Sequence, residues 1–179
     1  MTANTVGVLA LSLMVYGLVR KDNQHLLLLI SAGVFLWAVH YGLMGSTSGA
    51  IVHVIAGFGV YLAHATYHAS FRYRLLLAGI VSCLGVAGSL YTGITPANLL
   101  AAIGGVIMTA SQYILRGTHM RQGFLLGEGV FFFFALIIGS VPGMLVTVIN
   151  VGAGLLGLFR IHRARQSHPP SNKDILHEV

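Results

Sequence analysis

The chain has 179 residues, of which 56% are hydrophobic and 8% are charged, and its mean hydropathy is +0.83. A soluble domain usually carries about 25% charged residues, which cover much of its water-facing surface. This composition therefore excludes an ordinary soluble protein. The apolar runs are continuous and do not alternate with polar residues, which excludes a transmembrane barrel and predicts an all-α membrane protein.

The net charge of +6 does not indicate nucleic-acid binding. The ten Lys and Arg residues fall in short clusters between the apolar runs, where such residues set membrane topology. The single cysteine, Cys83, lies in an apolar run and can form no internal disulfide, and the sequence has no zinc-ligand spacing.

Seven apolar segments follow one another along the chain, several of them near the lower limit of about 17 residues for a membrane span. We expect helices at residues 4–20, 24–44, 48–68, 73–92, 96–115, 121–139 and 143–162. The first is predicted to be a membrane helix. A signal peptide carries its positive charges before the apolar run, whereas Arg20 and Lys21 follow it.

The connections between these helices are of two kinds that alternate strictly. Arg or Lys occurs near 20–24, 69–74 and 116–122, whereas 45–48, 92–95 and 140–142 carry no charge. With seven spans, every Lys and Arg falls on one side of the membrane, which the positive-inside rule makes cytoplasmic. The sequence therefore predicts an N-terminus outside and a C-terminus inside, with residues 163–179 as a basic, disordered cytoplasmic tail.

Two segments of the chain resemble each other, which indicates an internal repeat. Within residues 45–62, Gly45, Ser46, Gly49, Val52, Val54, Ile55 and Leu62 recur within residues 139–156 as Gly139, Ser140, Gly143, Val146, Val148, Ile149 and Leu156. Residues 1–68 and 96–162 are thus predicted to be two three-helix repeats, joined by a linker helix within 69–95. The linker makes the repeats parallel, and substrate sites in such proteins lie between the repeats near the bilayer midplane.

This plan of three, one and three helices resembles the topology of the PQ-loop and SWEET sugar transporters. The Pro-Gln dipeptide of the PQ-loop group is absent, and the nearest segment runs from Thr95 to Asn98.

Short motifs between residues 39 and 160 resemble the YgjV family of bacterial inner-membrane proteins. These motifs are Val39-His40, Leu43-x-Gly45, Gly49-Ala50, Ile55-Ala56, Gly117-Thr118-x-Met120-Arg121, Gly139-Ser140-x-x-Gly143, Asn150 and Phe159-Arg160. The resemblance implies a multi-pass protein of the bacterial inner membrane and indicates no activity.

Glu128 is the one acidic residue inside a predicted span, since Asp22, Asp174 and Glu178 lie outside the spans. A charged group at the bilayer centre costs roughly 2.5–3.5 kcal/mol on insertion scales, so such groups face the protein interior or a watery cavity. Two interpretations stay open. Glu128 is a carboxylate that couples transport to protons or binds a cation, or it is a structural acid, protonated, bonded to a neighbouring helix or close to the cytoplasmic end of its own helix.

Polar and aromatic side chains inside the spans supply further candidates for a solute site. His53 is the repeat counterpart of Thr147, and Asn150 lies one turn from Thr147, so His53 and Asn150 are predicted to face each other across the central axis. The other candidates are His40, Trp37, Asn98 and Gln112. The alternatives are ordinary interhelical hydrogen bonds of about 0.6 kcal/mol and an aromatic belt at the membrane surface.

Two other patterns are interpreted without a site. His64 and His68 lie one turn apart, but no Cys or carboxylate accompanies them, so no metal site is predicted. The run 131–134 consists of four phenylalanines that point all round a helix, so part of it is expected to face lipid.

The predicted function is passage of a small polar solute through a site between the two repeats, coupled to protons through Glu128. The alternative is a non-transporting membrane subunit or scaffold of a larger complex, because the loops are short and the soluble mass is small. The sequence has no nucleophile–base pair and no metal motif, so we expect neither an enzyme nor a cofactor. The expected partners are the lipid bilayer, the solute, and a second copy or another membrane protein.

Overall fold

The computed structural model describes residues 3–45, 47–91, 93–139 and 141–167, and the regular elements within these ranges are all α-helices. The helices are α1 (Ala3–Val19), α2 (Asn23–Leu43), α3 (Thr47–Ala65), α4 (Phe71–Leu90), α5 (Pro96–Tyr113), α6 (Gly117–Ile137) and α7 (Val141–Ser167). The prediction of an all-α chain with seven helices is confirmed for this part of the chain.

The connection between α3 and α4 is longer than predicted. α3 ends at Ala65 and not at residue 68, so His68 lies in the turn that follows the helix. α4 begins at Phe71 and not at residue 73, because the Ser70 hydroxyl accepts a hydrogen bond from the backbone N–H of Tyr73. Serine is a preferred residue at this N-cap position.

α7 is longer than predicted at its C-terminal end. It continues to Ser167 and not to residue 162, so residues 163–167 of the predicted disordered tail are helical. Arg, Ala and Gln predominate in this extension and are all good helix formers. The rest of the predicted tail, 168–179, lies outside the described residues.

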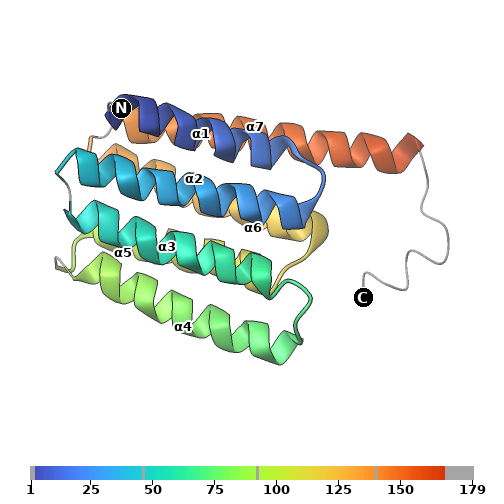
Figure 1. Ribbon diagram of the computed structural model, residues 1–179, viewed down its shortest axis with the longest axis horizontal. Coiled ribbons are helices and arrows are strands. Elements are labelled where there is room, and N and C mark those ends of the chain that lie inside the picture. The colour runs from blue at the N-terminus through green and yellow to red at the C-terminus, as the bar shows by residue number, and fades with distance from the viewer. Residues whose placement is uncertain (1–2, 46, 92, 140, 168–179) are drawn as a thin grey trace.

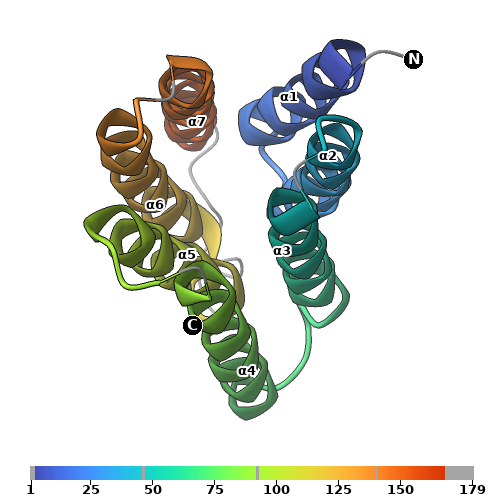
Figure 2. The same cartoon turned by 90° about the vertical axis from the view of Figure 1, so that its left-hand side faces the viewer.

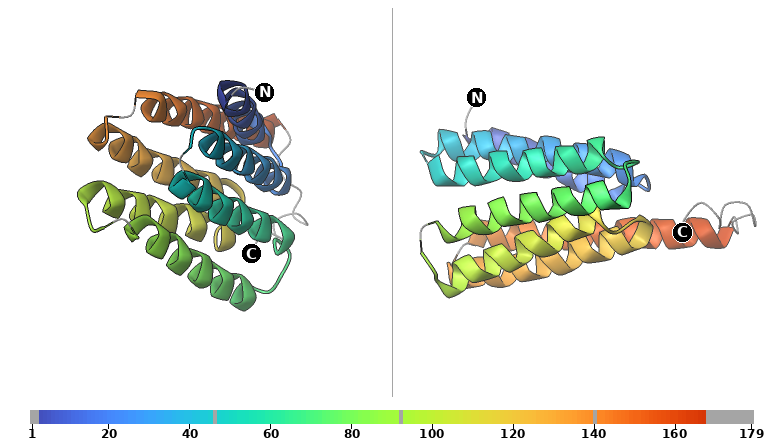
Figure 3. Two further views of the ribbon diagram at one scale, coloured as in Figure 1. Left: turned by 60° about the vertical axis from the view of Figure 1, so that its left-hand side comes forward. Right: turned by 90° about the horizontal axis from the view of Figure 1, so that it is seen from below.

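The helices form two rows that face each other, α1–α2–α3 and α7–α6–α5 (Figure 1, Figure 2). Within each row, consecutive helices are neighbours, and the rows meet where α1 contacts α7 and where α3 contacts α5. α4 packs against α5 and α3 at one side of the two rows (Figure 3). Helices from residues 1–68 therefore lie opposite helices from residues 96–162.

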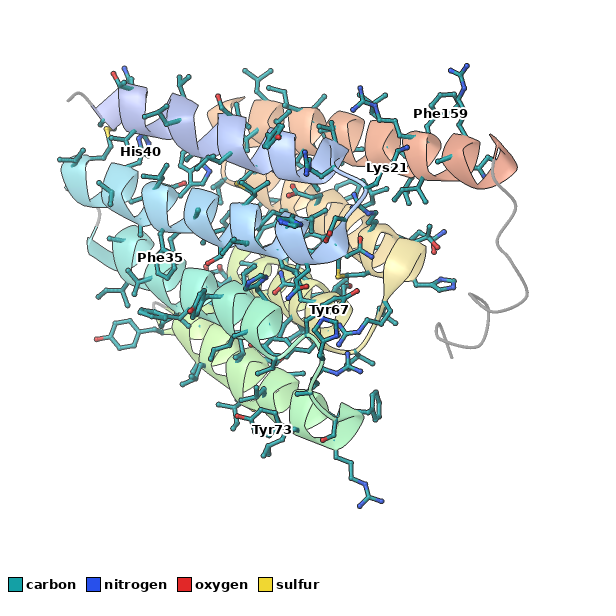
Figure 4. All side chains as sticks on the ribbon, turned by 45° about the vertical axis from the view of Figure 1, so that its right-hand side comes forward. Lys21, Phe35, His40, Tyr67, Tyr73 and Phe159 are labelled. Carbon is teal, nitrogen blue, oxygen red and sulfur yellow. The ribbon has the colours of Figure 1, made fainter. Side chains whose placement is uncertain are left out.

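The charged connections gather at one end of the bundle. The α1–α2, α3–α4 and α5–α6 connections lie there, together with the C-terminal end of α7 (Figure 1). Lys21 lies at this end and His40 near the opposite end (Figure 4). The charged and uncharged connections, which alternate along the chain, therefore lie at opposite ends of the bundle.

Three arginines at the charged end donate hydrogen bonds to carbonyl groups at or just after helix C-termini. The pairs are Arg121 Nη1 with the Leu18 oxygen at 2.9 Å, Arg74 Nη1 with the Tyr113 oxygen at 2.8 Å, and Arg116 Nη2 with the Tyr67 oxygen. Arg121 is buried and also donates through Nε to Asn23 Oδ1 at 2.9 Å. The last carbonyls of a helix lack intrahelical partners and attract cations, so these arginines tie separate helices together.

The turns that follow α2 and α6 have the same backbone geometry. Gly45 has a φ of 78° and Gly139 a φ of 68°, a left-handed conformation that glycine adopts without steric penalty. In both turns the residue before the glycine donates to the carbonyl four residues back, and the glycine donates to the carbonyl three residues back. These glycines are the first matched pair of the sequence repeat, whereas the next pair, Ser46 and Ser140, lies outside the described residues.

Several helices have the length and composition of membrane spans. Among the described residues, four are long and apolar enough to cross a membrane, namely Asn23–Leu43, Phe71–Leu90, Gly117–Ile137 and Gly143–Ala164. The apolar helices Ala3–Val19 and Ala50–Ala65 are shorter. Large apolar side chains such as Leu126 (67%) and Leu76 (60%) are exposed on the outer faces, as expected for side chains that contact lipid.

α7 approaches α1 closely at Gly157. A Cβ atom at Gly157 would overlap the Leu18 carbonyl oxygen and would lie 3.1 Å from Arg121 Nη1, which donates to that oxygen. The absent side chain therefore lets the two rows meet at their α1–α7 edge. At Gly152, by contrast, no atom lies within 4 Å of such a Cβ.

We predict that Gly157→Ala destabilises the protein by about 1–3 kcal/mol, the usual range for an overpacked site. The backbone carbonyl of Leu18 cannot rotate away as a side chain could. The measurement is the midpoint of thermal unfolding in detergent, with Gly152→Ala as the matched control. The control should leave the midpoint unchanged or raise it, and equal effects of the two substitutions would contradict this interpretation of the α1–α7 contact.

Candidate functional site

A cavity of about 300 Å³ lies between the two rows of helices. Residues of α1 to α6 line it, and the lining includes no residue from the described part of α7. Most of the lining is aliphatic or aromatic. Ligand pockets typically measure about 300–1,000 Å³ and combine an apolar lining with a few polar groups, so this cavity suits a small ligand.

A small set of polar side chains lines the cavity. They are His53 on α3, Ser82 and Ser89 on α4, Thr109 and Gln112 on α5, and Glu128 on α6. Because α4 and α5 are neighbours, four of these groups belong to adjacent helices. The aromatic members of the lining, Phe124, Phe131 and Phe134, come from α6, as does Glu128.

Glu128 lies near the middle of α6 and is only 8% exposed. Its Oε1 accepts a hydrogen bond from Asn150 Nδ2 on α7 at 3.0 Å. No hydrogen bond to its other oxygen, Oε2, and no ion pair to its carboxylate occurs within the described residues. Asn150 of α7 therefore holds the carboxylate by a hydrogen bond, while the Glu128 side chain also lines the cavity.

The helical periodicity of α6 explains why Glu128 points inward. Met120, Phe124 and Glu128 are buried and follow one another at intervals of four, and Gly127 and Ala135, three residues after Phe124 and seven after Glu128, are buried as well. Residues at this spacing share one helix face. Leu126 and Phe133 are 67% and 58% exposed and lie on the outer surface, so the carboxylate is directed away from the surface where lipid would lie.

The structure gathers four of the predicted candidates around this cavity, and Gln112 is one of those that line it. Glu128 and His53 line it, and Asn150, which is 2% exposed, contacts it through Glu128. The predicted opposition of His53 and Asn150 across the central axis stays a prediction, and the contact that joins Asn150 to the lining is its hydrogen bond to Glu128. Thr147 is buried and donates to the carbonyl of Gly143 within its own helix.

Three other predicted site residues, His40, Trp37 and Asn98, are not among the described residues that line the cavity. His40 Nδ1 lies 2.8 Å from the Ala3 carbonyl oxygen, and the Trp37 ring packs edge-on against the His40 ring at 5.0 Å. Asn98 Nδ2 donates to the Gly93 carbonyl at 2.7 Å, in the connection before α5. These contacts join α1 to α2 and close the α4–α5 connection, and a role in solute binding for the three residues stays a prediction.

Sequence reasoning missed part of the lining. Of the four consecutive phenylalanines, Phe133 is exposed as expected, but Phe131 and Phe134 line the cavity. The signal was present, because Phe124, Glu128 and Phe131 follow one another at intervals of four and three and therefore share a face. Ser82, Ser89 and Thr109 gave no such signal, since a single hydroxyl in an apolar helix is common.

Within the described residues, no group of three or more His, Cys, Asp or Glu side chains lies close enough to hold a metal ion. His64 Nδ1 lies 3.0 Å from the Gln24 carbonyl oxygen, at the start of α2. This contact joins α3 to α2, so His64 takes part in helix packing.

Asp22, the other carboxylate that the structure describes, lies at the charged end and caps α2. Its Oδ1 accepts from the backbone N–H groups of Gln24 and His25, and its Oδ2 lies 3.0 Å from His25 Nδ1. Partial burial raises the pKa of Asp22, but the hydrogen bonds from His25 and Gln24 outweigh that effect and lower it below its ordinary value. Asp22 is thus an ionised carboxylate outside the cavity and a natural control for Glu128.

Comparison with protein families places most of the chain in a known family. Residues 1–165 match the Imp-YgjV family, which is described as a bacterial inner membrane protein. No curated protein and no solved structure matches the chain. The match covers all seven helices except the last residues of α7.

We predict that Asn150→Leu is more destabilising than the double variant Asn150→Leu with Glu128→Leu. The single substitution leaves a buried carboxylate without its partner, which costs about 1–3 kcal/mol, whereas the double substitution removes both polar groups. Thermal unfolding of the two single variants, the double variant and the wild type gives the coupling energy. Effects that add within about 0.3–0.5 kcal/mol would mean that the two residues are independent.

Proposed function

Because the chain belongs to the Imp-YgjV family of bacterial inner membrane proteins, we propose that it crosses this membrane seven times and carries a small solute through the cavity between its two rows of helices. The N-terminus lies outside and the C-terminus in the cytoplasm. Glu128 exchanges protons with the cavity and couples their movement to the solute.

The distribution of charge supports this orientation. The described Lys and Arg residues lie in the connections and helix ends at one end of the bundle. Short loops rich in Lys and Arg stay on the cytoplasmic side. The shorter helices are consistent with spans, because α1 has 17 residues, the lower limit of about 17 for a transmembrane helix.

We predict that labelling of single cysteines reports opposite sides for Ile94→Cys and Lys21→Cys. In a Cys83→Ser background, a membrane-impermeant maleimide added to intact spheroplasts should label Ile94→Cys, whose native side chain is 79% exposed in the α4–α5 connection. Lys21→Cys should be labelled only after the membrane is permeabilised. The reverse pattern, or labelling of both before permeabilisation, would contradict the proposed orientation.

The arrangement of helices also supports two parallel repeats. A two-fold axis along the membrane normal would exchange α1 with α5 and α3 with α7, so it would convert the α1–α7 contact into the α3–α5 contact. Both contacts occur. The left-handed glycines Gly45 and Gly139 occupy matching turns. In proteins with such repeats, substrate sites lie between the repeats, which is where this cavity lies.

The buried carboxylate is the observation that carries the transport proposal. Ionisable residues inside a membrane bundle face cavities and mark ion paths and proton relays. Glu128 fits this rule, because it lines the cavity and has Asn150 as its hydrogen-bond partner.

Asn150 can serve both protonation states of Glu128. Its Nδ2 donates to the carboxylate, and its Oδ1 is buried without a partner among the described residues. An amide has one accepting oxygen and two donor hydrogens. Rotation of this amide would therefore let Oδ1 accept the proton of a protonated Glu128, so that loss or gain of the proton leaves no broken hydrogen bond.

Transport in proteoliposomes tests the proposal. With a proton gradient across the membrane, uptake of a panel of cationic, neutral, anionic and sugar solutes identifies a substrate. For that substrate we predict that Glu128→Gln lowers gradient-driven uptake by at least about tenfold, because glutamine keeps the shape of the side chain but releases no proton. Asp22→Asn, which removes the carboxylate outside the cavity, should leave uptake within about twofold of the wild type.

Two results would contradict the proposal. If Glu128→Gln transports as well as the wild type while folding normally, Glu128 is a structural acid. If the wild type moves no member of the panel, the alternative of a non-transporting subunit gains support, and purification from native membranes should then yield a stoichiometric membrane-protein partner.

A further inference from the structure

The lining of the cavity has an uneven distribution of charge. Among the described residues that line it, Glu128 is the only acidic residue and none is Lys or Arg. The nearest basic residue along α6, Arg121, directs Nε to Asn23 and Nη1 to the carbonyl of Leu18, both at 2.9 Å. An ionised Glu128 therefore has no countercharge within the described part of the protein.

The protein supplies the carboxylate with one neutral donor, Asn150 Nδ2. Transfer of an ionised carboxylate into an apolar environment is very unfavourable unless the charge is paired. Such a carboxylate is stabilised either by a proton or by a cation that enters the cavity. The geometry thus favours positively charged solutes over sugars, which carry no charge to pair with Glu128.

Two further acceptors lie in the lining on α5. Thr109 and Gln112 are three residues apart on one face of α5 and both line the cavity. Neither side chain has a hydrogen-bond partner among the described residues. An ammonium group donates three hydrogen bonds, and a hydroxyl oxygen, an amide oxygen and a carboxylate oxygen all accept them.

The aromatic side chains of the lining suit the rest of such a solute. Phe124 and Phe131 lie one turn from Glu128 on either side along α6, and the three residues line the same cavity. Aromatic faces attract cations. They also provide apolar contact for a hydrocarbon body.

We propose that the solute is a small organic amine in its ammonium form, with its charged group bound by Glu128, Thr109 and Gln112 and its apolar body against the phenylalanines of α6. This proposal rests on the proposed transport function and names the class of its substrate. The lining places aliphatic residues such as Ile30 and Val34 on the opposite row, where they complete an apolar compartment for the body of the amine.

A proton and the ammonium group compete for Glu128 under this proposal. The other titratable residue in the lining is His53 on α3. The lining residues of α1, α2, α4 and α5 carry no titratable group, and α7 presents the neutral Asn150 to Glu128. Binding of the amine should therefore weaken as the pH is lowered. His53→Gln should keep this pH dependence, because Glu128 and not His53 is the group for which the two cations compete.

The test compares two probes that differ in one group, phenethylamine and 2-phenylethanol. An aliphatic amine with a pKa near 10 is protonated at neutral pH, whereas the alcohol is uncharged. Titration calorimetry on the full-length protein in detergent should show at least about tenfold tighter binding of phenethylamine, since a hydrogen bond to a charged group contributes about 1.5–3 kcal/mol.

Variants assign the preference to residues. Glu128→Gln should abolish the preference for the amine while the protein still binds 2-phenylethanol, which shows that the cavity is intact. Thr109→Val and Gln112→Leu should each weaken phenethylamine binding by about ten- to a hundredfold, the range for a hydrogen bond to a charged group. Asp22→Asn should bind both probes as the wild type does.

Equal binding of the two probes by the wild type, no binding of phenethylamine, or an amine preference that survives in Glu128→Gln would overturn the proposal. If Glu128→Gln does not fold, the pH dependence of the wild type decides, and amine affinity that is independent of pH counts against Glu128. Amine binding without flux in proteoliposomes would contradict the transport function and leave the amine site in place. Flux of uncharged solutes with no preference for amines would leave the transport function in place and contradict the amine site.

Discussion

The hydrogen bond between Glu128 and Asn150 is the interaction on which the proposed function depends. It joins α6 to α7 at 3.0 Å and holds the one carboxylate found among the described lining residues. An apolar interior does not tolerate an unpaired charge, so a residue of this kind must be neutralised by a proton, a partner or a ligand. The fold supplies a neutral partner, Asn150, and a cavity. Either a proton or a bound cation can then neutralise the carboxylate.

Two other features of the bundle are consistent with that requirement, namely the position of the basic residues and the contact between α1 and α7. The basic residues lie at one end, where Arg121 and Arg74 donate to the carbonyls that finish α1 and α5. None of them lies in the cavity lining, so they do not neutralise Glu128. At the α1–α7 edge, the absence of a side chain at Gly157 lets the rows meet.

Much of the fold could be predicted from the sequence, because apolar runs and charged connections directly reflect the membrane environment. The seven helices and the matching turns at Gly45 and Gly139 follow from local patterns. The inward direction of Glu128 follows from the cost of exposing it to lipid. The burial of Arg121 could not be predicted, since it depends on a carbonyl about a hundred residues away in the chain. The lining hydroxyl of Thr109 depends likewise on how the two rows pack.

Infrared difference spectroscopy of the carboxyl band tests the central claim most directly, because it observes the protonation of Glu128 itself. At a pH low enough to protonate this residue, addition of phenethylamine to the wild-type protein should remove the band of a protonated carboxyl group. The same addition to Glu128→Gln should leave that region of the spectrum unchanged, and Asp22→Asn should behave as the wild type. An unchanged carboxyl band in wild-type protein saturated with the amine would contradict the claim that proton and cation exchange at this carboxylate.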